Sequence, residues 1–349
     1  MSEANPILVE VLRGGIAESM HRGAVAIVDA AGALHTALGD IERPVFPRSA
    51  VKVLQALPLV ASGAADAWGL NDEELALACA SHGGEPMHVA AAAAMLAKAG
   101  LDAQALECGA HWPSHEPSER ALAAAGTAPG PLHNNCSGKH AGFVCLGCHL
   151  AGRRGAAAFV RGYGQPDHAV MREVGAALEA ATGVRLAQAP HGIDGCSIPT
   201  YAMPLRALAL AFARVGTGQG LRPDHAQAAH RLRRAVAAAP QMVAGSGRFD
   251  TRLMQCLGER VFCKVGAEAV YCAALPELGL GVALKMDDGN TARAAEVVMA
   301  QLVATLLPLA AAEAALVQEL AEPALRNWNG LAVGALRAAG PLRQRLGAS

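Results

Sequence analysis

Apolar and polar positions alternate over the first 40 residues in the manner of β-strands. Strand-like runs are PILVEVLRGG, GAVAIVDAAG and ALHTALGD, and the turn residues AAG predict a hairpin between the last two. Strand character returns late in the chain, in RVFCKVGAEAVYCAAL and GLGVALKM, with a second hairpin predicted around PELG. The pattern therefore predicts β-strands near both ends of the chain.

Between these strands, apolar residues recur at helical spacing. A helix is predicted from about Ser49 to Val60, followed by helical patterns in DEELALACA, PMHVAAAAAMLAKAG, SERALAAAG, GKHAGFVCLGCHLAG, HAVMREVGAALEAATG and PDHAQAAHRLRRAVAAA. A long apolar helix is predicted from about Thr291 to Leu320. This order predicts an α/β (α+β) fold, in which the two ends form one mostly antiparallel sheet and the middle forms a helical subdomain. We expect the active site in the cleft between these parts.

The length of 349 residues is enough for one large domain or two modest ones. We expect a single domain over 1–349, with the helical part over roughly 49–255 and the sheet from roughly 5–40 and 260–290, plus C-terminal helices. A hydrophobic fraction of 52% argues against disorder. A net charge of −1 without a basic block and an aromatic fraction of 3% argue against nucleic-acid binding.

Neither end of the chain resembles a membrane segment. The N-terminus, MSEANPILVEVLRGG, has no basic region followed by a sustained apolar stretch, and LVATLLPLAAAEAALV is interrupted by Pro308 and Glu313. We therefore expect a soluble, cytoplasmic protein that does not bind membranes.

The nine cysteines are scattered and, in the cytoplasm, are expected to be reduced. Those inside apolar runs are interpreted as small core residues, namely Cys79, Cys256, Cys263 and Cys272. Cys145 and Cys148 form a C-x-x-C, but no second pair completes a zinc set, and the surrounding segment is typical of a buried helix. A structural role is favoured for this pair as well.

Ser49 and Lys52 are three residues apart at the start of a predicted helix, so their side chains share one face. A serine there is helped by the helix dipole, and a neutral lysine at this spacing can accept its proton. The same pattern arises by chance, and serine is a common helix N-cap. Context favours catalysis, because Ser81-His82-Gly83 and Lys264-Val265-Gly266 occupy the positions of the two later motifs of acyl-serine enzymes.

The stretch HNNCSGKH repeats this spacing with Cys136 and Lys139. A thiol, an amine and an imidazole this close could serve as a catalytic group, a metal site or neither. From the residue types alone, His133 and His140 are more usual metal ligands than a lysine.

Six motifs in order carry a family resemblance: PRSAVKVLQALPL, ASHGGEPMHV, CGAHWPSHEPSERAL, HNNCSGKHAGF, HGIDGCSIP and LKMDDG. Together they resemble the type II asparaginase family of the Rhizobium etli kind, over nearly the whole chain. The resemblance implies hydrolysis of L-asparagine to L-aspartate and ammonia, a fold similar to serine β-lactamases and glutaminases, and a homodimer. It implies Ser49 as nucleophile and Lys52 as its base, with Ser81 and Lys264 as a second Ser–Lys pair.

The same resemblance implies a zinc ion (Zn2+) held by Cys136, Lys139 and Cys196. Zinc accepts thiolates readily, but a lysine must be deprotonated to bind, so we expect the affinity to fall as the pH drops. Three protein ligands leave a fourth position for water or substrate.

Substrate recognition is assigned on charge. Asp194 could pair with the α-ammonium of an amino acid and Arg48 with its α-carboxylate, although either could instead belong to a structural ion pair. Further candidates for lining the site are Glu85, Asn135 and His140. Asp287 and Asp288 are interpreted as a turn at a strand end.

Three alternative functions remain open from the sequence. The first is a glutaminase or another ω-amidase, the second a β-lactam-recognising acyl-serine enzyme, and the third a non-catalytic zinc-binding protein.

Overall fold

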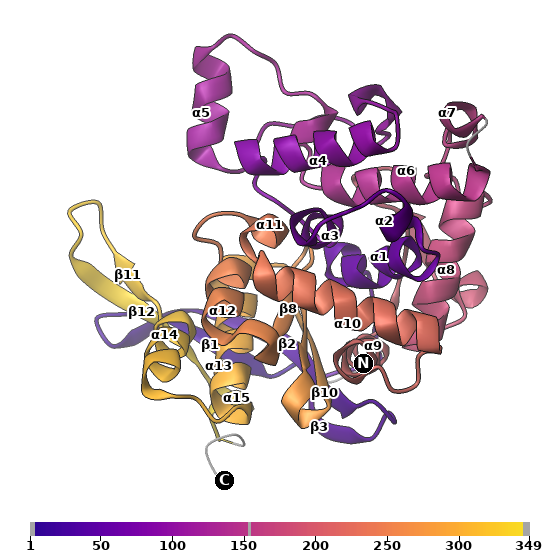
Figure 1. Ribbon diagram of the computed structural model, residues 1–349. Coiled ribbons are helices and arrows are strands. Elements are labelled where there is room, and N and C mark those ends of the chain that lie inside the picture. The colour runs from indigo at the N-terminus through magenta and orange to yellow at the C-terminus, as the bar shows by residue number, and fades with distance from the viewer. Residues whose placement is uncertain (1–3, 153–154, 345–349) are drawn as a thin grey trace. The chain divides into compact units, whose positions relative to one another are not determined.

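The computed structural model describes residues 4–152 and 155–344 (Figure 1). The chain divides into two compact units. The first comprises Met1–Ala50, Met203–Ala213 and Cys263–Ser349, and the second comprises Val51–Ala202 and Arg214–Phe262.

The first unit is built on one sheet drawn from both ends of the chain. Its strand order is β11-β12-β1-β2-β10-β9-β8, with β3 paired to β2. Strand β1 pairs antiparallel with β2 and β12, and β10 pairs antiparallel with β2 and β9. The strands are β1 (Ile7–Arg13), β2 (Ile16–Asp29), β3 (Leu34–Leu38), β8 (Phe262–Val265), β9 (Val270–Leu275), β10 (Leu280–Met286), β11 (Ala324–Arg326) and β12 (Ala332–Ala338). The predicted fold class, with both hairpins, is confirmed.

The centre of this sheet is buried because its strands carry apolar residues on both faces. Val25, Ile27 and Val28 of β2 are fully buried, and β10 pairs with them in register, Val282 opposite Ile27. Helix α9 (Leu205–Thr217) packs closely against β10, since a Cβ on Gly281 would lie only 1.9 Å from the Ala209 carbonyl oxygen. Glycine is therefore required where helix and strand meet.

One expectation for the C-terminal region was wrong. The single helix predicted over 291–320 is a π-helical turn (Thr291–Ala295) running into α13 (Glu296–Leu306), followed after a break by α14 (Ala311–Ala321). The break includes Pro308, which cannot donate a helical hydrogen bond.

Strands β11 and β12 were not predicted, because their alanines and glycines have little intrinsic strand preference. They form because β12 adds to the edge of β1, with Val9 opposite Ala338 and Arg13 opposite Gly334 (Figure 1). The short pair β4 (Pro44–Val45) and β7 (Met203–Pro204) and the terminal α15 (Gly340–Gln344) complete the elements of this unit.

The second unit is helical, and every helix predicted within it is present. Its helices are α1 (Lys52–Ala61), α2 (Ala64–Ala67), α3 (Asp72–Ala78), α4 (Pro86–Lys98), α5 (Glu116–Ala124), α6 (Ser137–Ala151), α7 (Ala156–Phe159), α8 (Ala169–Thr182), α10 (Pro223–Ala238), α11 (Gln241–Ala244) and α12 (Phe249–Leu257), with a small hairpin of β5 (His191–Ile193) and β6 (Pro199–Tyr201). Helix α6 lies at the centre, because α1, α3 and α4 all contact it. Residues Ser137–Cys148 are consequently buried all round.

The cysteines of α6 are core residues, as predicted. Cys145 and Cys148 are buried free thiols, and burial raises the pKa of Cys145 to about 12. Of the other predicted core cysteines, Cys256 differs, being only half-buried on α12. No helix in the described residues combines the length and the apolar character needed to cross a bilayer.

Candidate active site

Lys52 is the first residue of α1, and its side chain is almost fully buried. Its amine donates a hydrogen bond to Ser81 Oγ at 2.9 Å and another to the Ala80 carbonyl oxygen. Burial lowers the pKa of Lys52 and Lys139 lowers it further, while Cys136 opposes the shift. The net direction is downward, so the neutral amine needed for a base is favoured.

Ser81 lies in the loop between α3 and α4, and neighbouring side chains fix this loop. His82 Nδ1 accepts the Gly84 N–H at 3.1 Å, so the ring proton is on Nε2, which donates to Ser137 Oγ at 2.9 Å. Burial is the largest factor holding the pKa of His82 well below its ordinary value. The loop is thus tied to the first turn of α6 by a neutral histidine.

The predicted zinc ligands gather in the second unit. Cys136 is the N-cap of α6, Lys139 lies one turn later, and Cys196 lies in the turn between β5 and β6. Lys139 Nζ is 3.0 Å from Cys196 Sγ. A hydrogen bond with Cys196 lowers the pKa of Cys136 well below its ordinary value against the effect of burial, and Lys52 and Lys139 lower it further. The same hydrogen bond raises the pKa of Cys196.

These residues fit a zinc ion by type and convergence. Two sulfurs and one amine nitrogen, all buried, lie close together. The lowered pKa of Cys136 favours the thiolate that zinc requires. Among the described residues, no three His, Cys, Asp or Glu side chains are arranged to hold a metal, so a site here depends on the lysine. The histidines considered from sequence each use Nδ1 elsewhere, since His140 Nδ1 meets Tyr163 Oη at 2.6 Å and His133 Nδ1 accepts the Gly130 N–H. Within the described residues, the buried His140 Nε2 has no hydrogen-bond partner.

Arg48, Ser49 and Lys264 belong to the first unit. Arg48 and Ser49 lie in a 3-10 turn, Arg48–Val51, and Arg48 has a left-handed backbone with φ of 50°. Lys264 in β8 is fully buried, and its amine donates to the Val265 carbonyl oxygen at 2.7 Å. Gly266, just after β8, lies against the turn, because a Cβ there would be 2.5 Å from the Pro47 carbonyl oxygen. The strand end that carries Lys264 therefore adjoins the turn that carries Ser49.

Asp194 belongs to the tight turn that holds Cys196. Its carboxylate accepts the Gly195 N–H at 2.7 Å, and its backbone N–H donates to the Ile198 carbonyl oxygen. Asp194 also raises the pKa of Lys139, after the larger effects of burial and the two cysteines. Its charge therefore acts on Lys139, one of the predicted zinc ligands.

Asp287 and Asp288 form the turn after β10, as expected. Asp287 accepts hydrogen bonds from Asn5 and Arg43, each at 2.9 Å, and Asp288 pairs with His21 at 2.5 Å. Their carboxylates are used in holding the sheet end together.

The sequence of this chain matches the model of one known protein family. A family model described as L-asparaginase II matches residues 9–338. The chain belongs to the L-asparaginase II family. Membership makes the protein an amidohydrolase-type hydrolase with a small-molecule substrate. The resemblance carried by the six motifs is confirmed.

The similarities between this asparaginase-family protein and solved structures are weak. Curated proteins gave no match. A crystal structure of Mglu is 18% identical over 83% of this chain and 69% of that chain, with a TM-score of 0.34; Mglu in its glutamate form gives the same identity and TM-score over 63% of that chain. A β-lactamase from Mycobacterium bovis is 14% identical over 79% of this chain and 90% of that chain, with a TM-score of 0.36. Similarity at this level establishes neither a shared fold nor a shared substrate.

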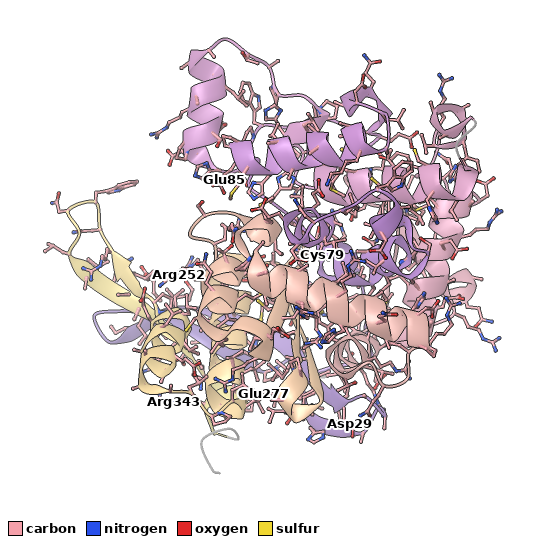
Figure 2. The ribbon with its side chains drawn as sticks, in the orientation of Figure 1. Asp29, Cys79, Glu85, Arg252, Glu277 and Arg343 are labelled. Atoms are coloured by element: carbon pink, nitrogen blue, oxygen red, sulfur yellow. The ribbon has the colours of Figure 1, made fainter. Side chains whose placement is uncertain are left out.

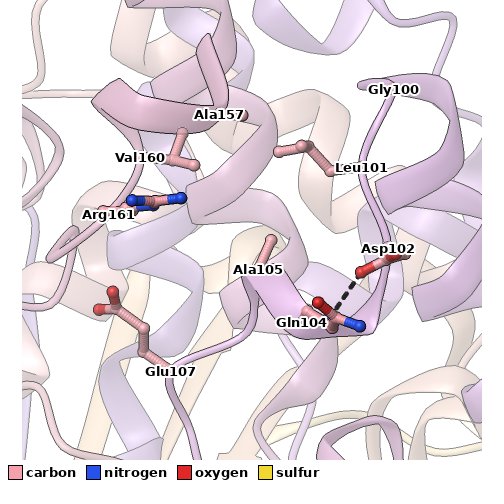
Figure 3. Close-up of a pocket in the computed structure, with 9 residues that line it drawn as sticks. All are labelled: Gly100, Leu101, Asp102, Gln104, Ala105, Glu107, Ala157, Val160 and Arg161. Atoms are coloured by element: carbon pink, nitrogen blue, oxygen red, sulfur yellow. Dashed lines mark hydrogen bonds between the residues drawn. The ribbon is translucent and has the colours of Figure 1, made fainter.

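One surface pocket of the second unit is separate from the predicted site. A surface pocket of about 510 Å³ contains Arg161 and Glu107 on its wall (Figure 3). The Glu107 carboxylate accepts the Gly162 N–H at 2.6 Å, so it braces the turn that carries Tyr163. None of the predicted site residues lines this pocket.

Sequence reasoning missed two residues that shape the loops of the site. Tyr163 is fully buried and bonds to His140, the neighbour of Lys139. Ser246 bonds through both its backbone and its hydroxyl to Glu85. The only signal for Ser246 was its place between two glycines, which is typical of any loop.

Proposed function

We propose that the protein is an L-asparaginase that hydrolyses L-asparagine to L-aspartate and ammonia through an acyl-enzyme on Ser49. The observation that carries the proposal is the buried Lys52 amine, whose charged form is disfavoured and which bonds to Ser81 Oγ at 2.9 Å. A buried lysine whose neutral form is favoured is the base that an acyl-serine mechanism needs, and Ser49, three residues before Lys52, is the predicted nucleophile.

In this mechanism, neutral Lys52 accepts the hydroxyl proton of Ser49 as Ser49 Oγ attacks the side-chain amide carbon of the substrate. The C–N bond then breaks, the proton returns from Lys52 to the leaving nitrogen, and ammonia departs. Water attacks the resulting β-aspartyl ester and gives a proton to Lys52, and Ser49 recovers its proton as aspartate is released. Ser81, bonded to Lys52, and Lys264 tune the charge on this base as the second Ser–Lys pair.

Binding of the amino-acid head is assigned to Arg48 and Asp194. Arg48 would take the α-carboxylate through its planar guanidinium, and Asp194 the α-ammonium. The left-handed backbone of Arg48 supports a special role, because such a conformation is costly in a residue with a side chain.

Cys136, Lys139 and Cys196 would hold the zinc ion, which when bound would supply a positive charge able to polarise an oxygen of substrate or water. The chain's own contribution is to hold Cys136 as a thiolate near Lys52 and to hold Asp194 and Cys196 in one tight turn. We further propose a homodimer of single-domain chains in the cytoplasm, on the strength of the family resemblance.

The test compares wild type, Ser49→Ala and Ser62→Ala, where Ser62 is an exposed serine at the end of α1. Ammonia release from L-asparagine should vanish in Ser49→Ala and persist in Ser62→Ala. Intact mass at short times should show an aspartyl adduct in wild type and Ser62→Ala but not in Ser49→Ala. Undiminished release by Ser49→Ala would overturn the nucleophile.

The same assay separates the other functions. Faster release from L-glutamine than from L-asparagine would make the enzyme a glutaminase or another ω-amidase. Covalent labelling by a β-lactam would favour the acyl-serine alternative, and zinc binding without any ammonia release would favour the non-catalytic one.

A further inference from the structure

Glu85 is a buried carboxylate with no part in the proposed mechanism. It is the N-cap of α4 (Figure 2), and its exposed fraction is only 7%. One carboxylate oxygen accepts the Ser246 backbone N–H at 2.8 Å, and the other accepts the Ser246 hydroxyl at 2.6 Å. Both oxygens of one carboxylate thus hold a single residue of the loop between α11 and α12.

Gly245 makes this contact possible. Its backbone has φ of +115°, and a Cβ at this position would lie 2.4 Å from Glu85 Oε1. The Thr251 hydroxyl donates to the Gly245 carbonyl oxygen at 2.6 Å from the other side. The loop is therefore fixed against Glu85 in a conformation that only glycine adopts easily.

The segment just before Gly245, which runs from Gln241 to Ala244, is hydrogen-bonded to Ser81. The Ser81 backbone N–H donates to the Val243 carbonyl oxygen at 2.8 Å. At the start of the segment, His88 Nε2 bonds to the Gln241 carbonyl oxygen at 3.0 Å. Val243, whose carbonyl oxygen accepts the Ser81 N–H, thus lies between two residues that are held in place. Gln241 is held by His88 and Ser246 by Glu85.

The charge on Glu85 suits this role. Burial raises the pKa of Glu85, but the two hydrogen bonds from Ser246 and the nearby imidazoles of His88 and His115 lower it by more. His115 Nε2 lies 3.9 Å from Glu85 Oε2. The carboxylate is therefore ionised at neutral pH, which strengthens both hydrogen bonds.

We propose that Glu85 is a positioning residue for Ser81, acting by clamping Ser246 so that the Val243 carbonyl oxygen holds the Ser81 backbone beside Lys52. This inference rests on the proposed function, in which Ser81 belongs to the Ser–Lys machinery. A hydroxyl 2.9 Å from Lys52 Nζ loses its contact when its backbone shifts by about an ångström, which is enough to slow a reaction greatly.

The test uses Glu85→Gln, with Glu74→Gln as the matched control. Glu74 is a buried carboxylate of the same unit that accepts the Asn71 N–H at 2.8 Å and pairs with Lys98, so neither of these contacts involves Ser246. Amide hydrogen exchange across Ser81 and Ser246 should accelerate roughly ten- to hundredfold in Glu85→Gln, the range expected for losing a charged hydrogen bond, and stay at the wild-type rate in Glu74→Gln.

The kinetic readout is the split between kcat and KM. Glu85→Gln should lower kcat for L-asparagine roughly tenfold with little change in KM and no loss of bound zinc. Equal effects in both variants, or wild-type exchange at Ser81 in Glu85→Gln, would overturn the inference.

Two features keep the test decisive. If Glu85→Gln does not fold, Ser246→Ala removes only the hydroxyl bond and should shift exchange at Ser81 in the same direction by a smaller factor; no shift there would also overturn the inference. If wild type releases no ammonia from L-asparagine, the proposed function fails, while the exchange comparison still decides whether Glu85 positions Ser81.

Discussion

The Lys139 amine lies 3.0 Å from the Cys196 sulfur, although 57 positions separate the two residues in the chain. Lys139 comes from a buried helix and Cys196 from a tight turn, so the contact is set by tertiary packing. In the free protein the pKa values of both Lys139 and Cys196 are raised, so each group keeps its proton, whereas a metal would require both to give theirs up.

Metal binding should therefore depend steeply on pH and on each ligand. Cys136→Ala and Cys196→Ala should each lose zinc, because one sulfur and the lysine make too few ligands. Metal content after dialysis at several pH values is the measurement, and Cys148→Ala on the same helix is the control. Full zinc content in Cys136→Ala would contradict the ligand set.

Gly138→Ala should disrupt the position of Cys136 and Lys139 together. A Cβ on Gly138 would lie 2.4 Å from both the Leu77 carbonyl oxygen and Leu77 Cγ, so α6 would have to move away from α3. We expect a loss of about 1–3 kcal/mol in the free energy of unfolding, the usual cost of overpacking a core. Gly142→Ala, whose nearest contact would be a milder 3.3 Å, is the control in denaturant unfolding.

Tyr163→Phe should lower stability without removing a metal ligand. The phenol oxygen accepts the Glu107 N–H at 2.9 Å and bonds to His140, and both partners are left unpaired in the buried interior. The expected loss is about 1–3 kcal/mol in the free energy of unfolding. Unchanged thermal and denaturant midpoints would show that the hydroxyl contributes nothing.

Glu85 should give the protein an acid-sensitive share of its stability. Its pKa in the folded chain is below the ordinary 4.5, so its contribution is fully present above that value and is lost as the pH falls through the lower, folded-state pKa. Wild type should exceed Glu85→Gln in unfolding free energy at pH 7, with the difference shrinking in acid. A difference that stays constant down to low pH would contradict this.

Thiol reactivity should follow burial. Burial raises the pKa of Cys145 to about 12 and of Cys108 to about 12, so neither should react with iodoacetamide in the native protein at pH 8. Mass mapping of the alkylated protein checks this, with the half-buried Cys256 as the internal comparison. Rapid native labelling of Cys145 would show that α6 opens readily.

The sequence predicts best what local periodicity determines. The hairpin of β2 and β3 and the long helices follow from apolar spacing, because each element buries a face that its own residues define. Local periodicity does not predict strand β12. Its small residues form a strand only by pairing with β1, more than 300 positions earlier. Pro308 shows the reverse error, where apolar character outweighed a local breaker in the prediction.

The same distinction applies to the candidate site. The i, i+3 spacing of Cys136 and Lys139 is legible along the chain, because both lie on one turn at the start of α6. The hydrogen bond from Lys52 to Ser81 and the clamp between Glu85 and Ser246 are not, because each joins the start of a helix to a loop that the packed core brings close to it. The roles of Ser49 and Lys264 remain predictions.

The pairing of β1 with β12 sets an order of events during synthesis. Residues Ile7–Arg13 leave the ribosome more than 300 residues before Ala332–Ala338, so one edge of this strand stays unpaired until those residues emerge. Until then β1 exposes unpaired backbone groups of the kind that recruit other chains. A premature stop before residue 332 would leave the helical unit fully synthesised and the sheet with an open edge, so nascent or truncated chains should be the species that aggregate.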